Sequence, residues 1–308
     1  MQNFIITLGV FLFFVIWTLI EQKQLVIKKY DITSKELPAS FHNTSFVVLA
    51  DLHNHTFGKH NEKLVQRIDK LNPEFIILAG DMITKRIPCY PSNAYVLLEQ
   101  LSKRYKIYYA YGNHEQKIEW ILKESMENRN GQRGEMTEAE EECIDITWNE
   151  YKKRVSLLGV TFLDNESVNM SKGKESIRIT GLSIGKEFFE RGNFPVMEME
   201  YPDSLIGRKP QDQYQILIAH NPIHFKQYAN WGANLTIAGH MHGGLARIPG
   251  IGGVISPQVK FFPKFTGGKY TENEKVMIVS RGLGTHSSMP RYFNVPEIVS
   301  ITLKSMDK

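Results

Sequence analysis

Short apolar runs alternate with helical patterns along the first third of the chain. Residues 46–50, 75–79 and 107–111 are almost wholly apolar, which is typical of strands buried on both faces. Between them, residues 63–71 place apolar side chains on one helical face, and residues 92–103 form the next helix. This alternation predicts a largely parallel sheet with helices packed outside it.

The pattern becomes less regular after the third strand. Residues 116–142 are polar and predict a surface excursion, and residues 147–158 resume as a helix. We expect a second, more antiparallel sheet from the short runs at 160–163, 167–168 and 177–182. An irregular insertion at 185–213 is rich in Phe, Met and Pro, and its apolar side chains are suited either to packing under a loop or to contacting lipid or substrate.

The N-terminus carries an uncharged apolar run at residues 4–20. As a helix it would be about 26 Å long, which predicts a transmembrane helix at the short end of the usual range. A cleaved signal peptide and a buried globular helix are the alternatives. We therefore expect a membrane anchor at 1–23 and one catalytic domain at 24–308. Lys23, Lys28 and Lys29 favour the cytoplasmic face for that domain, with the extracytoplasmic face left open.

Composition narrows the function classes. The net charge of +4 comes without a dense basic stripe, so we expect no nucleic-acid partner, and no obligate protein partner is inferred. Only Cys89 and Cys143 occur, which argues against a disulfide framework or a thiolate zinc site. Any metal is therefore expected to bind imidazole, carboxylate and amide groups.

Five predicted strands end in polar side chains of the kinds that bind metals. These residues are Asp51, His53, Asp81, Asn113, His114, His220, His240 and His242. The carboxyl ends of parallel strands meet at one edge of a sheet, so we expect these side chains to lie together. Asp51-x-His53 and His240-x-His242 also place two ligands on the same side of an extended segment. The set predicts a site for two metal ions.

The same residues carry a resemblance to a known family. Asp51-x-His53, Gly80-Asp81, Gly112-Asn113-His114-Glu115, His220 and Gly239-His240-x-His242 follow the motif order of the calcineurin-like metallophosphoesterases. The segments Gly282-Leu283-Gly284, Pro290-Arg291 and Pro296-Glu297-Ile298 resemble the membrane-anchored YkuE/YaeI-like branch. The resemblance implies an α/β fold, a four-layer α/β/β/α sandwich of two mixed β-sheets flanked by helices. Together with the apolar run, the expected fold has an N-terminal transmembrane helix.

The resemblance also implies roles for the site residues. One metal would be held by Asp51, His53, Asp81 and His242, and the second by Asp81, Asn113, His220 and His240. Mn²⁺, Fe²⁺ and Zn²⁺ are the expected ions. Two such ions, two carboxylates and a bridging hydroxide leave about one positive charge to attract a phosphate.

Three of these residues are the expected catalytic set. Asp81 would bridge the metals, Asn113 would donate to the phosphate through its amide, and His114 would protonate the leaving oxygen. Glu115 would either orient His114 or serve the start of a helix.

The predicted function is metal-dependent hydrolysis of a phosphodiester or pyrophosphate. A lipid-linked or nucleotide–lipid phosphate is the expected substrate class, motivated by the anchor and the Phe-rich insertion. A general phosphomonoesterase or protein phosphatase is the alternative within enzymes. A non-catalytic metal-binding scaffold and a metal-storage or sensing site are the alternatives from other classes.

Overall fold

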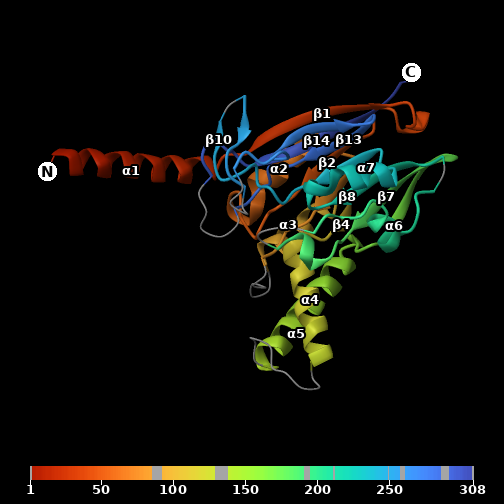
Figure 1. The fold of residues 1–308 in the computed structure, drawn as a ribbon, viewed down its shortest axis with the longest axis horizontal. Helices are drawn as coiled ribbons and strands as arrows, with labels where there is room; N and C mark the ends of the chain where they lie inside the picture. The colour runs from red at the N-terminus through yellow and green to blue at the C-terminus, as the bar shows by residue number, and fades with distance from the viewer. Residues whose placement is uncertain are drawn as a thin grey trace.

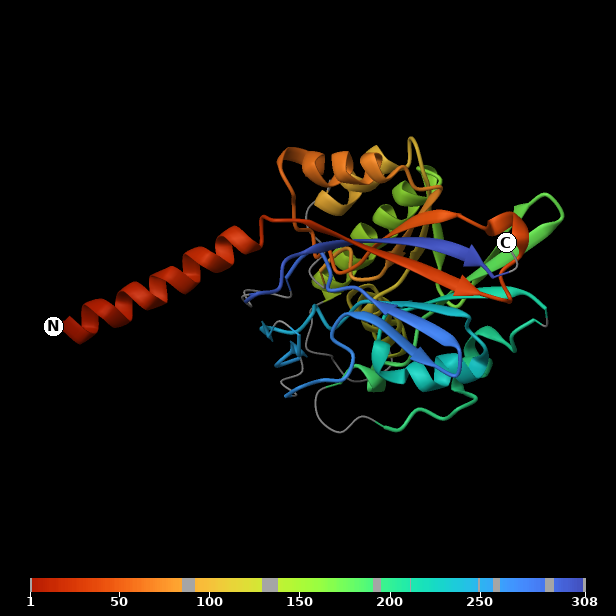
Figure 2. The same cartoon turned by 90° about the horizontal axis from the view of Figure 1, so that it is seen from above.

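Two stacked six-stranded sheets form the body of the molecule, and helices cover their outer faces (Figures 1 and 2). The computed structural model describes residues 2–84, 92–128, 138–190, 195–210, 212–248, 250–256, 261–285 and 291–306. Both sheets mix parallel and antiparallel pairs.

The first sheet has the strand order β1-β14-β2-β3-β4-β5. Its strands are β1 Val26–Ser34, β2 Ser45–Leu49, β3 Phe75–Ala79, β4 Lys106–Ala110, β5 Thr161–Leu163 and β14 Glu297–Ser305. Strands β2, β3, β4 and β5 run parallel, whereas β14 pairs antiparallel with β2. The C-terminal strand thus lies between the first two strands of the domain.

The second sheet has the strand order β12-β13-β9-β8-β7-β6. Its strands are β6 Ser167–Lys172, β7 Glu175–Leu182, β8 Tyr214–Ala219, β9 Leu235–Ala238, β12 Gly268–Glu272 and β13 Lys275–Val279. The four central strands are parallel and each edge strand is antiparallel to its neighbour. A two-stranded ribbon, β10 Arg247–Ile248 with β11 Gly252–Gly253, follows β9 along the chain.

Apolar clusters join these layers. Phe46 and Ile77 from the first sheet pack with Ile179 and Ile216 from the second, because alternate side chains of each strand point into the space between the sheets. The helices are α2 Glu62–Leu71, α3 Asn93–Leu101, α4 Asn113–Asn128, α5 Glu138–Leu157, α6 Tyr201–Ile206 and α7 Phe225–Trp231. Buried side chains of α2, α3, α4 and α5 cover the first sheet, and α7 covers the second.

Two expectations differ from the structure. The polar stretch predicted as a surface excursion is helical at residues 116–128 and 138–142, its described parts, because α4 and α5 pair with each other and α5 buries Trp148 against the first sheet. The run at 160–163 belongs to the first sheet, where β5 pairs parallel with β4. A three-residue strand carries too little pattern to reveal which sheet it joins.

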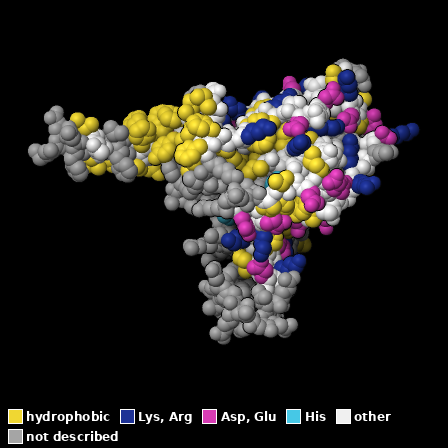
Figure 3. All heavy atoms as spheres, in the orientation of Figure 1, with side chains coloured by type: hydrophobic (Ala, Val, Ile, Leu, Met, Phe, Trp, Pro, Cys, Tyr) yellow, Lys and Arg dark blue, Asp and Glu magenta, His cyan; other side chains and the backbone are white. Residues whose placement is uncertain are grey.

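The predicted transmembrane helix is wrong. An N-terminal helix, α1 Gln2–Glu21, projects from the domain with apolar side chains along it (Figures 1 and 3). Within the described part of the chain, however, no helix has both the length and the apolar character needed to cross a membrane. The predicted anchor at 1–23 and the localisation on a membrane, with a favoured cytoplasmic face, are therefore wrong as well. The boundary between residues 23 and 24 stays a prediction.

The physical reason lies in the last two turns of α1, which pack on the domain. The Phe14 ring lies 6.0 Å from the Tyr292 ring and the Trp17 ring 5.6 Å from the Phe293 ring. The buried carboxylate of Glu21 accepts a hydrogen bond from the backbone N–H of Phe293 at 2.9 Å. Side chains that contact the domain in this way belong to the folded unit and are not free to face lipid.

Candidate metal centre

The site lies where the carboxyl ends of five strands from both sheets meet. Asp51 follows β2, Asp81 follows β3 and Asn113 follows β4 in the first sheet. His220 follows β8 and His240 follows β9 in the second. The parallel direction of the central strands in each sheet brings these turns to one edge of the sandwich.

The backbone at the site is held in left-handed conformations. The φ angle is +52° at Asp51, +47° at His53, +53° at Asp81, +68° at His240 and +48° at His242. Residues other than Gly rarely adopt this region, and such strain persists only where the surrounding structure imposes it. Five strained residues in one centre indicate turns shaped to bring their side chains together.

Backbone hydrogen bonds between the turns impose this strain. The N–H of Asp51 donates to the carbonyl of Gly80 and the N–H of His53 to that of Asp81, both at 3.0 Å. Gly112 approaches so closely that a Cβ there would lie 2.2 Å from Oδ1 of Asp81. No other residue fits that position, which explains the glycine before Asn113.

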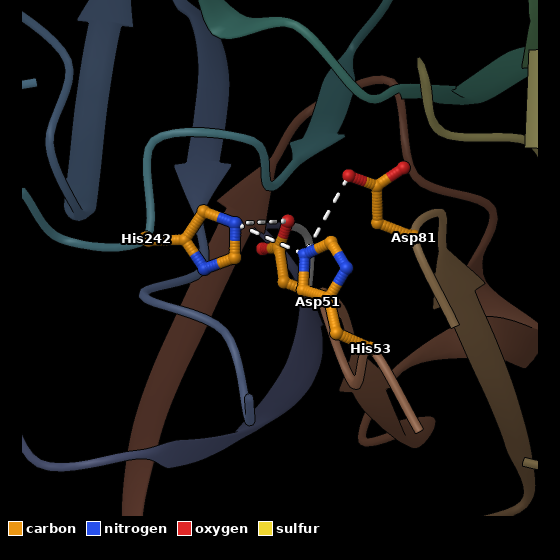
Figure 4. Close-up of side chains that lie close together, drawn as sticks. All are labelled: Asp51, His53, Asp81 and His242. Carbon is orange, nitrogen blue, oxygen red and sulfur yellow. Dashed lines mark hydrogen bonds and ion pairs between the residues drawn. The ribbon is translucent and has the colours of Figure 1, made fainter. Parts of the chain in front are cut away.

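One group of ligand-type side chains comprises Asp51, His53, Asp81 and His242 (Figure 4). Each offers one ligand atom, and these four atoms lie within 4.8 Å of one another. Nε2 of His53 is 3.1 Å from Nε2 of His242 and 3.7 Å from Oδ2 of Asp81. Nε2 of His242 is 3.5 Å from Oδ1 of Asp51. All four residues are buried.

A second group comprises Asp81, His220 and His240 and meets the same 4.8 Å limit. Nε2 of His220 is 3.3 Å from Oδ2 of Asp81. Nδ1 of His240 is 2.8 Å from Oδ1 of Asn113, which brings the predicted amide ligand to this group. The structure therefore gathers all seven predicted metal ligands, and Asp81 is common to both groups.

The electrostatics of the centre reflect two buried carboxylates among imidazoles. Burial raises the pKa of Asp51 to about 7. Burial acts in the same direction on Asp81, but His220 and His114 outweigh it and hold the pKa of Asp81 well below its usual range. Burial lowers the pKa of His220, yet the charge of Asp81 overcomes that effect and raises it to about 9.

The donor set fits divalent cations. Oδ2 of Asp51, although fully buried, makes no hydrogen bond to any residue that the structure describes. Nδ1 of His220 lies 2.6 Å from the carbonyl oxygen of Ala79, so Nδ1 carries the proton and Nε2 presents its lone pair toward Asp81 in the neutral ring. A buried carboxylate oxygen without a donor and oriented imidazoles are what a cation would satisfy.

His114 lies beside the group that contains His53. Its ring centroid is 4.7 Å from that of His53, and its Nε2 is 4.0 Å from Oδ2 of Asp81. Its backbone N–H donates to Oδ1 of Asp81 at 2.8 Å, so the start of α4 also fixes the carboxylate. Its catalytic role and the ligand roles assigned above stay predictions.

Glu115 organises the turn that carries Asp81. Its fully buried carboxylate accepts hydrogen bonds from the backbone N–H groups of Asp81 at 2.8 Å, Met82 at 2.9 Å and Gly112 at 3.0 Å. The hydroxyl of Tyr109 donates to it at 2.7 Å. Burial, with the charge of Asp81, raises the pKa of Glu115. The residue acts on the turn that bears Asp81, a role that its place in the sequence does not reveal.

Arg291 and Asn294 also contact the segments that form the centre, although their places in the sequence predict no role there. Both are buried, Asn294 fully and Arg291 with 3% exposure. An Asn and an Arg near the end of the chain carry no spacing that relates them to Asp51 or His242, so only the fold reveals them.

Comparison with known proteins identifies the class. Residues 44–244 match the calcineurin-like phosphoesterase family, and this stretch covers more than half of the chain. The chain therefore belongs to the calcineurin-like phosphoesterases, a family of hydrolases that is consistent with its two-sheet α/β fold and its buried Asp/His cluster.

Similarity to individual proteins extends beyond residues 44–244. The chain is 23% identical over 293 residues to the uncharacterized metallophosphoesterase YkuE of Bacillus subtilis. This match covers 93% of this chain and 88% of that protein. It is 30% identical over 146 residues to the uncharacterized protein YpbG of Bacillus subtilis, covering 47% of this chain and 49% of that protein. Membership of the YkuE-like branch stays a prediction.

Among solved structures, the chain shows a weak match to phosphopantetheinyl hydrolase from Mycobacterium tuberculosis. It has a TM-score of 0.41 and 11% sequence identity, and the match covers 76% of this chain and 88% of that one.

Proposed function

We propose that the protein hydrolyses phosphodiesters at a centre of two divalent metal ions. The observation that carries this proposal is the Asp81 carboxylate, which belongs to both groups of ligand-type side chains. A shared carboxylate is the arrangement that places two ions close enough to act on one phosphate.

The residues of the chain would divide the work as follows. Asp51, His53 and His242 would hold one ion and Asn113, His220 and His240 the other, with Asp81 between them. Bound there, the ions would supply a hydroxide from water of lowered pKa and positive charge for the phosphoryl oxygens. His114 would deliver a proton to the leaving oxygen, since its ring lies beside the Asp81 carboxylate. Mn²⁺, Fe²⁺ and Zn²⁺ suit this mixed oxygen and nitrogen set.

The substrate that we propose carries an apolar group, as a lipid-linked phosphodiester does. The half-buried ring of Phe189 lies 5.3 Å from the ring of His240, and the Trp120 ring lies 6.1 Å from that of Phe189. The preceding residue anchors this aromatic pair, because the carbonyl of Phe188 accepts a hydrogen bond from the side chain of Asn221 at 3.0 Å. Two partly exposed aromatic rings beside the proposed metal ligands suit an apolar ester group.

Hydrolysis of a chromogenic phosphodiester by metal-stripped protein tests the reaction. We expect turnover to return when Mn²⁺, Fe²⁺ or Zn²⁺ is added. Asp81→Asn should abolish it, because both ions lose a ligand. His114→Ala should lower kcat by about 10²- to 10⁴-fold with metal binding kept, since it removes only the proton donor.

His60→Asn is the matched control for the histidine variant. His60 is exposed, lies outside the centre and has a φ of +53° that Asn tolerates. It should leave turnover unchanged. Metal binding by the wild-type protein without any turnover would contradict the proposed reaction and favour a metal-binding scaffold.

A pair of p-nitrophenyl phosphodiesters tests the substrate class. One carries a methyl ester and the other an octyl ester, so the leaving group is the same in both. We expect the wild-type kcat/KM to favour the octyl ester by about tenfold, since burying part of the alkyl chain is worth roughly 1–2 kcal/mol.

Phe189→Ala should remove most of that preference. Phe261→Ala, which truncates an exposed aromatic on a different loop, should retain it. Equal wild-type kcat/KM for the two esters would disprove the apolar substrate class and leave the reaction itself standing.

A further inference from the structure

The segment between β13 and β14 supplies two buried polar side chains that contact the turns of the metal centre. The segment lies outside residues 44–244, the part of the chain that matches the family. In the described part of this segment, the side chains of Arg291 and Asn294 make hydrogen bonds that lead to the turns bearing Asp51 and His242. Burying a guanidinium and an amide is unfavourable unless each makes hydrogen bonds, and both do.

Asn294 holds the turn that bears His242. Its side-chain NH₂ donates to the carbonyl of His242 at 2.6 Å and to that of Gly244 at 2.7 Å. The turn approaches the amide so closely that a Cβ on Gly243 would lie 2.3 Å from Oδ1 of Asn294. The amide therefore bridges two carbonyls of a turn in which His242 has a φ of +48° and Gly243 one of +72°.

Arg291 links this contact to the turn that bears Asp51. Its guanidinium donates to the carbonyls of Asn294 at 2.8 Å and Gly284 at 2.6 Å. The N–H of Gly284 in turn donates to the carbonyl of Asp51 at 2.7 Å. A Cβ on Gly284 would lie 2.2 Å from the carbonyl oxygen of Leu52, so the two segments are in close contact. Arg291 thus connects Asn294 with the backbone of Asp51.

His240 is held separately, although it shares a turn with His242. Its ring nitrogen lies 2.8 Å from the side-chain oxygen of Asn113, and its backbone N–H donates to Oδ1 of Asp51 at 3.0 Å. His220, from the same group, is fixed by the carbonyl of Ala79. The contacts of Asn294 therefore act on one group of ligands more directly than on the other.

We propose that Asn294 and Arg291 are positioning residues for the metal ion held by Asp51, His53, Asp81 and His242. Asn294 sets the His242 turn and Arg291 joins it to the Asp51 turn. The inference rests on the proposed two-metal function, because it requires both ions to bind. It adds the segment after β13 to the parts of the chain that determine metal affinity.

Calorimetric titration of metal-stripped protein with Mn²⁺ tests the proposal. We expect two ions per wild-type chain. Asn294→Ala removes both donors to the turn. It should lower the affinity for one of the two ions by at least tenfold and leave the affinity for the other within threefold of wild type. The spin coupling between the two Mn²⁺ ions in the electron paramagnetic resonance spectrum should disappear at concentrations that saturate only the tighter site.

Asn234→Ala is the matched control. Asn234 is another buried Asn with a backbone contact, since its Oδ1 accepts from the N–H of Gln215 at 2.8 Å, but it precedes β9 and so lies at the opposite end of that strand from His240. It should bind both ions with wild-type affinity. Arg291→Lys, which keeps the charge and loses the fork of donors, provides a second test if Asn294→Ala does not fold. Arg291→Lys should also lower the affinity for one of the two ions selectively.

The outcomes separate this inference from the function on which it rests. Two ions bound by Asn294→Ala with wild-type affinity, or both weakened equally, would overturn the positioning role while leaving the two-metal centre intact. Fewer than two ions bound by the wild-type chain would overturn the two-metal proposal itself, and this inference with it.

Discussion

At the scale of single residues, Glu115 shows how a buried charge shapes the centre without belonging to it. Its carboxylate gathers four backbone N–H groups and the Tyr109 hydroxyl around the turn that bears Asp81. Hydrogen bonds to a charged acceptor are worth roughly 1.5–3 kcal/mol each, and they hold Asp81 in its left-handed conformation.

We expect Glu115→Gln to destabilise the protein by about 3 kcal/mol and to weaken metal binding. The substituted amide keeps one oxygen acceptor, but its NH₂ group faces backbone donors, which leaves buried N–H groups unsatisfied. Urea unfolding measures the first effect and Mn²⁺ titration the second. Glu119→Gln on the same helix is the control, because Glu119 pairs with Lys152 at a partly exposed position. Equal effects of the two variants would contradict the role of Glu115.

At the scale of elements, α7 packs beside Phe188, the residue that precedes the Phe189 ring proposed to contact substrate. His224 immediately precedes α7 and its ring lies 5.1 Å from that of Phe188. The side chain is buried, and its Nε2 makes no hydrogen bond within the described part of the chain. Burial lowers the pKa of His224 to about 4 from its usual 6.5, because a charged imidazolium there would lose its hydration.

The free energy of unfolding should therefore decrease as the pH is lowered, because His224 must become charged. The folded pKa lies below the unfolded one, so the contribution of neutral His224 is present above pH 6.5 and is lost as pH falls from 6.5 toward 4. The loss amounts to about 2 kcal/mol at pH 5. Urea unfolding at pH 7.5 and pH 5 measures it. In His224→Phe, the free energy of unfolding should change about 2 kcal/mol less between pH 7.5 and pH 5 than in the wild type. An equal change in both proteins would refute the role of His224.

At the scale of the whole molecule, the candidate metal centre joins the two sheets. Asp51, Asp81 and Asn113 come from the first sheet, and His220, His240 and His242 from the second. Ions held by residues from both sheets would bind the folded chain and not the unfolded one. Their binding free energy would therefore add to the stability of the fold.

We expect Mn²⁺ to raise the melting temperature of metal-stripped protein by several degrees. An ion present at a hundred times its Kd stabilises the folded state by about 2.7 kcal/mol, because it binds only that state. A thermal scan with and without chelator measures the shift. Asp81→Asn should show a much smaller one, and an equal shift in this variant would place the stabilising ion elsewhere.

The sequence by itself determined the strand and helix alternation and the residue types of the candidate metal centre. A buried strand between amphipathic helices leaves a local pattern, as at residues 75–79, which form β3 without change of boundary. Polar residues such as Asp81 directly after these strands stand out for the same reason. The side-chain period of each element is a local property, so it can be predicted without the fold.

Only the tertiary structure decided which distant residues support the centre. Asn294 follows His242 by 52 residues, and Glu115 follows Asp81 by 34, yet each holds the backbone of that residue or of its turn. The same holds for α1, whose last turns pack on Tyr292 and Phe293. Asn294 and Glu115 bond to backbone groups and α1 makes long-range ring contacts, and neither kind of contact leaves a pattern in the sequence. They arise when packing of the two sheets brings separate turns to one edge, where buried donors and acceptors must be satisfied.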